Sequence, residues 1–172
     1  MLMKNASKGF TLIELIVSVG LFSLIMLLSS SAYLLMIGIN RQVQAMATGI
    51  NNLSFALETM TRTIRTGTNY SCNGVGDCTG GDTSFSVKNT NGNTVQYTLS
   101  GSAITQNGVA LTDPAVSVSS LKFYTFGTPT ARQSDYQQPR VTIIVSGTVS
   151  SGPGKTESFI IQTGATMRGS DL

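Results

Sequence analysis

Apolar residues crowd into the first forty positions of the chain, and Glu14 is the only charge between Phe10 and Asn40. The stretch 15–39 supplies about 25 uncharged residues, whereas a helix needs about 20 to cross a bilayer. We therefore expect a membrane-spanning helix over 10–40. The run is longer than the apolar core of an ordinary secretory signal. Because Ser30, Ser31 and Ala32 resemble a small-residue cleavage site, a cleaved signal peptide remains the alternative.

Past the apolar run, a one-sided apolar stripe predicts that the same helix continues to about Thr66. Its members recur at spacings of three and four residues and are Ile39, Val43, Met46, Ile50, Leu53, Leu57, Met60 and Ile64. The residues between them are polar, so the segment 41–66 is amphipathic, and Gly67 provides a stop. About three heptads are marginal for a coiled coil, which favours a helix lying on a sheet. Gly20, Gly38 and Gly49 are expected weak points in the helix.

The remaining sequence is rich in Thr, Ser, Asn and Gly, and it alternates apolar and polar residues in short runs that predict strands. Asn91-Gly92 and Asn107-Gly108 are hairpin turn signals, and SSGPGK at 150–155 indicates a closing hairpin. We expect 67–82 to be a loop, and the last residues give no clear signal. The expected strands are 84–88, 95–99, 103–105, 109–111, 116–124, 141–149 and 158–161. The sequence therefore predicts an α+β fold, a long helix packed on an antiparallel sheet, with a β domain over 83–163.

The distribution of charge predicts the orientation of the chain across the membrane. The formal net charge is +3, but Lys4 and Lys8 precede the apolar run and leave nine basic against eight acidic residues elsewhere. Basic residues on the short side favour a cytoplasmic N terminus, so residues 41–172 should form an extracytoplasmic domain. Nucleic-acid binding is not expected, because only Arg62 and Arg65 lie close together.

Composition also limits the chemistry. The chain has no histidine, which removes Ser-His-Asp and Cys-His nucleophiles and histidine metal sites. We find no nucleophile, base and orienting group at recognisable spacing, so we expect no catalytic residues, no cofactor and no enzyme activity. Cys72 and Cys78 enclose CNGVGDC, and in an oxidising compartment they could form a disulfide or remain free thiols. Asp77 and Asp82 could bind calcium, although such residues more often form turns.

At the start of the apolar run, the segment KGFTLIELIV (8–17) resembles the cleavage and methylation signature of type IV prepilins and type II secretion pseudopilins. The resemblance is close from Lys8 to about Leu27. It implies that residues 1–9 are a leader peptide, that prepilin peptidase cuts between Gly9 and Phe10, and that the new terminus at Phe10 is N-methylated. Glu14 would be the fifth residue of the mature chain and act in assembly. In a simpler role, the negative charge of Glu14 interacts favourably with the positive end of its own helix dipole.

A narrower resemblance covers LETMTRTIRTG and VQYTLSGSAITQNGVALTDPAVSVSSLKFYTF, which are similar to J-type minor pseudopilins and related minor pilins. It implies a pilin-like subunit of a type II secretion pseudopilus or a type IV pilus. Its partners would be other pilin or pseudopilin subunits, prepilin peptidase, the inner-membrane assembly platform and membrane lipid. The chain would first be a single-pass protein of the bacterial inner membrane and later part of the fibre. The cysteine pair follows the helix, which departs from the C-terminal disulfide of many major pilins.

The alternative function is a DNA-binding or adhesive minor pilin of a competence or surface-attachment pilus. Its binding residues would come from the loop 127–139, with Arg132, Tyr136 and Arg140 close by, or from Arg62 and Arg65 at the end of the helix. Such side chains are more often simply solvated.

Overall fold

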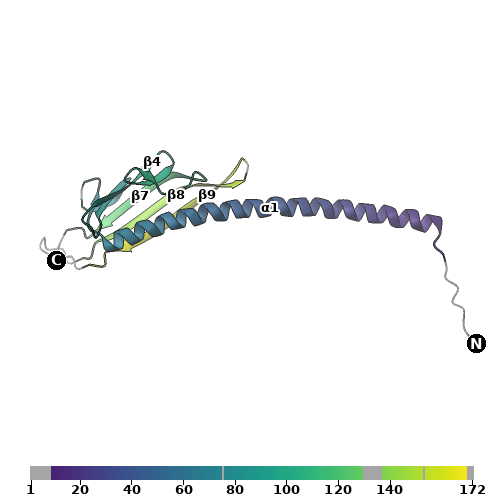
Figure 1. Ribbon diagram of the computed structural model, residues 1–172, viewed down its shortest axis with the longest axis horizontal. Helices are drawn as coiled ribbons and strands as arrows, with labels where there is room; N and C mark the ends of the chain where they lie inside the picture. Colours follow the sequence, from purple (N-terminus) through teal and green to yellow (C-terminus); the bar gives the residue numbers. More distant parts are fainter. Residues whose placement is uncertain (1–8, 75, 130–136, 153, 170–172) are drawn as a thin grey trace, which may run out of the picture. The chain divides into compact units, whose positions relative to one another are not determined.

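The computed structural model describes residues 9–74, 76–129, 137–152 and 154–169. Within these residues, one helix and nine strands follow each other, some of them labelled in Figure 1, and the chain divides into two units, residues 1–41 and 42–172. The helix α1 (Leu12–Thr66) is 55 residues long and has residues in both units. Each unit is described by itself below.

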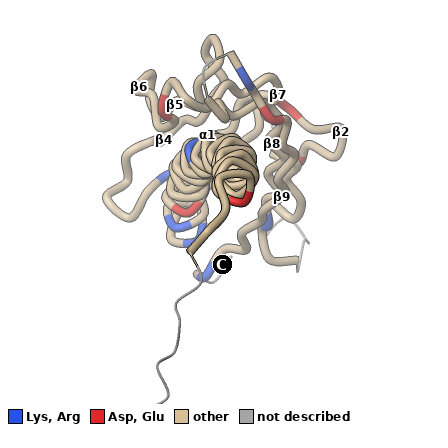
Figure 2. Tube along the Cα trace, turned by 90° about the vertical axis from the view of Figure 1, so that its right-hand side faces the viewer, with Lys and Arg blue, Asp and Glu red and all other residues tan. Residues whose placement is uncertain are grey.

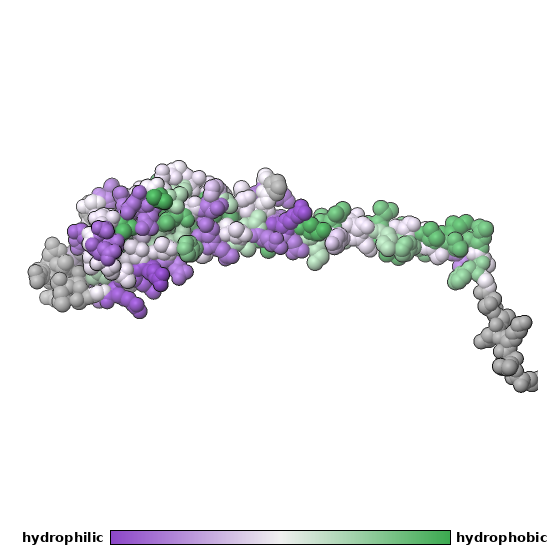
Figure 3. All heavy atoms as spheres, viewed as in Figure 1, coloured by the Kyte–Doolittle hydropathy of each residue, from purple (hydrophilic) through white to green (hydrophobic). Residues whose placement is uncertain are grey.

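In the first unit, α1 exposes its large apolar side chains from Leu12 to Ile39, apart from the half-buried Ile37, and Figure 3 shades much of this stretch green. Four of its five serines are satisfied internally, because the hydroxyls of Ser18, Ser23, Ser30 and Ser31 donate to backbone carbonyls three or four residues earlier. A helix that satisfies its own polar groups and presents an apolar surface suits a lipid environment. By length and composition, α1 can cross a membrane.

In the second unit, the rest of α1 packs against two antiparallel sheets. The five-stranded sheet has the order β1-β3-β4-β5-β6 and the four-stranded sheet the order β2-β7-β8-β9. The strands are β1 (Thr68–Cys72), β2 (Cys78–Asp82), β3 (Ser84–Lys88), β4 (Thr94–Ser100), β5 (Ala103–Gln106), β6 (Val109–Ala110), β7 (Val116–Phe126), β8 (Arg140–Gly152) and β9 (Lys155–Thr166). The predicted α+β fold, a long helix on antiparallel sheet, is confirmed.

The core forms where the helix meets the inward side chains of both sheets. Leu53, Met60 and Ile64 of α1 are fully buried, and they belong to one cluster with Phe85, Phe123 and other strand residues. Phe85 of one sheet stacks on Phe123 of the other, with ring centroids 5.4 Å apart. Alternate residues of β7 and β8 are buried, as the two-residue period of a sheet with one covered face requires.

The structure corrects two features of the predicted helix. Ile39 and Val43, the first members of the apolar stripe, are about 60% exposed, and Gly49 is the first fully buried helix residue. Gly49 is also a contact point and not merely a weak point, because a Cβ there would overlap Cγ2 of Val149 on β8. Absence of a side chain lets helix and strand approach closely.

The expectation of a loop over residues 67–82 was wrong, since β1 and β2 lie within it. β1 pairs with β3 and β2 pairs with β7, each with an irregular register. Asn69, Asn73 and Gly81 adopt positive φ, a conformation that these residue types tolerate. The segment therefore contains turn residues that interrupt two short edge strands. At the other end of the domain, β9 continues to Thr166, past the predicted strand 158–161 and past residue 163, where the β domain was expected to end.

Candidate functional site

The N-terminal candidate site lies at the first turn of α1. The backbone N–H of Glu14 donates to the Thr11 hydroxyl at 3.3 Å, and the N–H of Leu15 donates to the Thr11 carbonyl at 3.2 Å. Thr11 is therefore the N-cap, and Glu14 occupies the third helical position. Thr-x-x-Glu is the pattern of a capping box, a signal present in the sequence that our sequence analysis missed.

Glu14 is exposed in this first turn, and within the described residues its carboxylate has no ion-pair partner. An acidic side chain in the first turn is favoured by the helix dipole by about 0.3 to 1 kcal/mol. That contribution is smaller than the roughly 2.5 to 3.5 kcal/mol that a carboxylate costs at bilayer depth. The helix of a single chain therefore does not compensate for placing Glu14 in lipid.

Gly9 and Phe10 precede the helix and make no close packing contacts with other described residues. Phe10 is 82% exposed, and a Cβ added at Gly9 would meet nothing within 4 Å. The fold of the described chain thus does not require glycine at position 9. Residues 1–8, including Lys4 and Lys8, lie outside the described residues.

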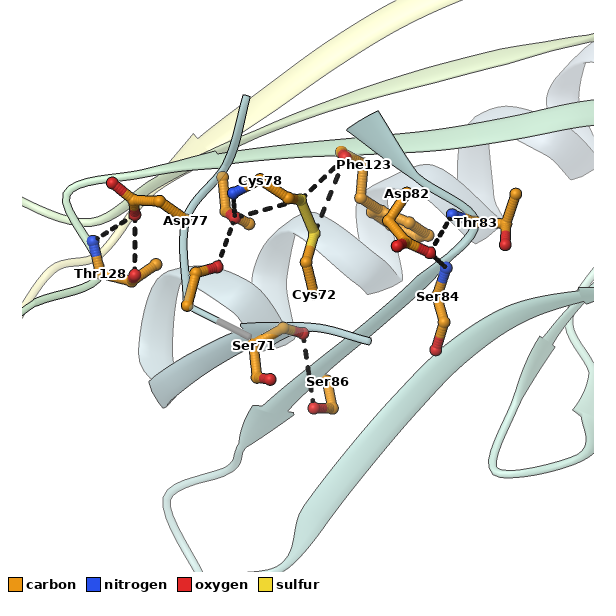
Figure 4. Close-up of a disulfide and its surroundings, with 12 residues drawn as sticks. Ser71, Cys72, Asp77, Cys78, Asp82, Thr83, Ser84, Ser86, Phe123 and Thr128 are labelled. Atoms are coloured by element: carbon orange, nitrogen blue, oxygen red, sulfur yellow. Dashed lines mark hydrogen bonds between the residues drawn. A yellow bond between two sulfur atoms is a disulfide. The ribbon is translucent and has the colours of Figure 1, made fainter. Parts of the chain in front are cut away.

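Cys72 and Cys78 form a disulfide, with their Cα atoms 6.1 Å apart (Figure 4). Cys72 ends β1 in the five-stranded sheet, and Cys78 begins β2 in the four-stranded sheet. The bond therefore links the two sheets directly beside the carbonyl of Phe123, which lies 3.3 Å from the Cys78 sulfur. Since Cys72 is 1% exposed, this arrangement points to a structural bond between sheets and not to an accessible redox site.

The two aspartates considered as calcium ligands accept backbone hydrogen bonds instead. Asp77 accepts from Gly127 N and from both the N and the hydroxyl of Thr128, and Figure 4 shows Asp77 facing Thr128. Asp82 accepts from the N–H groups of the next two residues. No cluster of three or more potential metal-ligating His, Cys, Asp or Glu residues occurs in the described part of the chain.

The arginines of the alternative function lie in different surroundings. Arg140 lies over the Phe126 ring, with 5.2 Å between the guanidinium carbon and the ring centroid. Arg62 and Arg65 line a hollow at the end of α1 together with Arg168. Arg168 was not a candidate, because the C-terminal tail gave no signal in the sequence. Arg132 and Tyr136 lie outside the described residues, as does most of the loop 127–139.

Comparison with known families gives one match, a profile described as the prokaryotic N-terminal methylation motif, over residues 4–30. The match includes Gly9, Phe10 and Glu14, so it covers the helix start described above. The chain carries the prepilin-type signature. No curated protein and no solved structure matches the chain.

The signature supports a pilin- or pseudopilin-type substrate of prepilin peptidase. The motif implies assembly with other pilins, and the apolar N-terminal part of α1 suggests membrane anchoring. The motif thus suggests a structural subunit. The narrower resemblance to J-type minor pseudopilins stays a prediction.

Proposed function

We propose that the chain is a minor pilin or pseudopilin that is cut between Gly9 and Phe10 and built into a fibre through its N-terminal helix. The observation that supports this most is the position of Glu14, a carboxylate with no ion-pair partner among the described residues, in the first turn of a helix whose N-terminal half has a largely exposed apolar surface. The chain would be inserted in the inner membrane with residues 41–172 outside, and then assembled into a type IV pilus or a type II secretion pseudopilus.

Cleavage would create the partner that Glu14 lacks. A free α-amine is largely protonated at neutral pH, so a processed Phe10 places a positive charge one turn from Glu14. The amine of one subunit paired with Glu14 of its neighbour turns two charges that are costly in lipid into one ion pair. Assembly is thereby favoured in a single register.

The test separates pairing from helix capping. Glu14→Gln retains an acceptor suited to a capping box but removes the charge, whereas Thr11→Val removes the cap and leaves the charge. Breaking a buried ion pair costs about 3 to 5 kcal/mol, which exceeds the roughly 1 kcal/mol of a lost cap. We expect Glu14→Gln to be processed normally, but its amount in isolated fibres should fall at least tenfold. Thr11→Val should be incorporated nearly as well as the unmodified chain.

Equal incorporation of Glu14→Gln and the unmodified chain would contradict the pairing. A deficit that is larger for Thr11→Val than for Glu14→Gln would instead assign Glu14 to capping alone. Gly9→Ala tests the cleavage step, because the added methyl group has free space and cannot disturb the fold. The expected result is an uncut chain in the membrane with an unchanged melting temperature.

A further inference from the structure

Three arginines meet at the end of the second unit where α1 stops. Arg62, Arg65 and Arg168, named here the arginine cluster, line a hollow of about 270 Å³. The N–H of Arg168 donates to the carbonyl of Arg65 at 2.9 Å, which holds the segment after β9 against the last turn of the helix. Basic positions appear on α1 and beside the C-terminal label in Figure 2. Arg65 and Arg168 also line an adjoining hollow of about 460 Å³ with Gln138, Gly164, Thr166 and Met167.

The arginine cluster has unused hydrogen-bonding capacity. All three side chains are exposed, and none forms an ion pair within the described ranges. The Thr61 and Thr66 hydroxyls of the first hollow already donate to helix carbonyls, so the free donors are guanidinium N–H groups. The helix dipole favours a cation in the last turn by about 0.3 to 1 kcal/mol, which accounts for Arg65. The helix dipole does not explain why Arg62 and Arg168 line the same hollow.

The chemistry of this site selects a small anionic group. Guanidinium presents its donors as a planar fork that matches the two oxygens of a carboxylate or phosphate. A nucleic-acid backbone fits less well, because residues 42–172 contain eight basic and seven acidic side chains and offer no continuous basic track. The described residues that line the two hollows include no aromatic side chain for base stacking, and Glu58 lies in the first hollow. A protein carboxylate suits the site better.

The opposite end of the same unit supplies carboxylates of this kind. The N–H of Asp113 donates to the side chain of Asn52 on α1. Asn52 precedes Arg65 by 13 residues, so Asp113 lies beside the helix about 20 Å before Arg65. Glu157 pairs with Val149, the residue that meets Gly49. Asp113 and Glu157 are both exposed. Asp113 and Glu157 therefore lie toward the end at which α1 enters the unit, with Lys155 on the same hairpin as Glu157, and the three arginines lie where α1 stops, with Glu58 among them.

We propose that the arginine cluster binds a carboxylate at the helix-entry end of the neighbouring subunit in the fibre, as Asp113 of a second copy would provide. The proposal rests on the proposed function, because subunits that keep one direction in a fibre place the entry end of one subunit against the far end of another. The interaction would fix the spacing of the β domains while Glu14 fixes that of the membrane helices.

The experiment uses Arg65→Lys and Arg168→Lys in the full chain, with Arg140→Lys as the matched control. Each change keeps the positive charge but introduces a primary amine. A water-soluble carbodiimide activates a carboxylate, the adjacent amine attacks it, and an amide bond forms while the carboxylate oxygen leaves in the urea by-product. The reagent adds no spacer, so only groups in direct contact react. Isolated fibres are treated, and the joined peptides are identified by mass spectrometry.

We expect Arg65→Lys and Arg168→Lys to give several-fold more intersubunit product than Arg140→Lys, with the new amine joined to Asp or Glu of a neighbouring subunit. Fibres that contain the chain but give no product above the control would overturn the inference alone. Joining to Asp135 or Asp171 of the same chain, which lie outside the described residues, would also overturn it. Absence of the unmodified chain from fibres would overturn the proposed function together with the inference.

Discussion

The contact between Gly49 and Val149 gives the sharpest test of how α1 lies on the four-stranded sheet. A Cβ at position 49 would overlap Cγ2 of Val149 and lie 3.7 Å from Cγ2 of Val116. Both valines are 2% exposed, and valine changes its side-chain rotamer reluctantly. Alanine in a helix is otherwise favoured over glycine by about 1 kcal/mol. Helix propensity and packing therefore predict opposite effects for Gly49→Ala.

The packing effect should dominate. Overpacking a well-filled core typically costs about 1 to 3 kcal/mol, and an overlap of this severity belongs at the upper end of that range. The expected net loss is about 1 to 2 kcal/mol in the free energy of unfolding. For a unit of this size the melting temperature should fall by about 3 to 8 °C. The measurement is thermal unfolding of the full chain in detergent, followed by near-ultraviolet circular dichroism of the buried tyrosines.

Two further variants identify the cause. Gly38→Ala should not lower the melting temperature, because a Cβ there meets nothing within 4 Å. Combining Gly49→Ala with Val149→Ala removes the overlapping methyl group, so the double variant should be more stable than the sum of the single effects by at least 1 kcal/mol. A melting temperature for Gly49→Ala that equals or exceeds that of the unmodified chain would refute the close approach of α1 to β8.

Three other predictions concern the β domain. Replacing both Cys72 and Cys78 by Ala should lower the free energy of unfolding by about 2 kcal/mol, the value for a closed loop this short, and urea titration with and without reductant measures it; reductant that shifts the midpoint of the double variant would contradict the bond as the cause. Burial raises the pKa of Tyr70 to about 12 and also raises the pKa of Tyr97. Both groups remain protonated in the folded chain at a pH where the unfolded chain ionises, so stability should hold below about pH 10 and fall above it. For Tyr70 the fall should run from about pH 10 to 12 at up to about 1.4 kcal/mol per pH unit, and an unchanged slope in Tyr70→Phe would exclude Tyr70 as its source. Asp77→Ala leaves the N–H groups of Gly127 and Thr128 without their acceptor and should cost about 1 to 3 kcal/mol in urea titrations, whereas Asp113→Ala at an exposed turn should cost less.

The sequence predicted the elements whose signals are local. The apolar run, the three-and-four spacing through Leu53, Met60 and Ile64, and turn pairs such as Asn107-Gly108 depend on residues near one another in the chain. Asn107 and Gly108 both adopt positive φ, as the hairpin turn signal requires. The helix and the central strands followed from these patterns.

The sequence did not predict features that depend on distant contacts. β1 and β2 are short, rich in turn-forming residues, and ordered by pairing with β3 and β7. As a glycine within a helix, Gly49 is expected from the sequence to be a weak point. Only the position of Val149 shows that it is a packing contact. The same reason explains why Arg168 was missed. Its position beside Arg65 depends on how far β9 extends, which its own neighbours in sequence do not specify.

Within the candidate site, sequence and structure contribute different parts. KGFTLIELIV gave Gly9, Phe10 and Glu14 through their spacing, and the methylation-motif match covers all three. The structure adds the Thr11 cap and the unpaired state of Glu14 in the described chain. The partner of Glu14 follows from neither source directly, because in the account proposed here it is created by cleavage and supplied by another subunit.

The central claim is that the chain is cut after Gly9 and methylated at the new terminus. The most direct test is mass spectrometry of the N-terminal peptide of the chain purified from cells. We predict a peptide that begins at Phe10 and carries one additional methyl group on its α-amine. A peptide that retains residues before Phe10, or one that begins just after the small residues around Ala32 as a cleaved signal peptide would, contradicts the account.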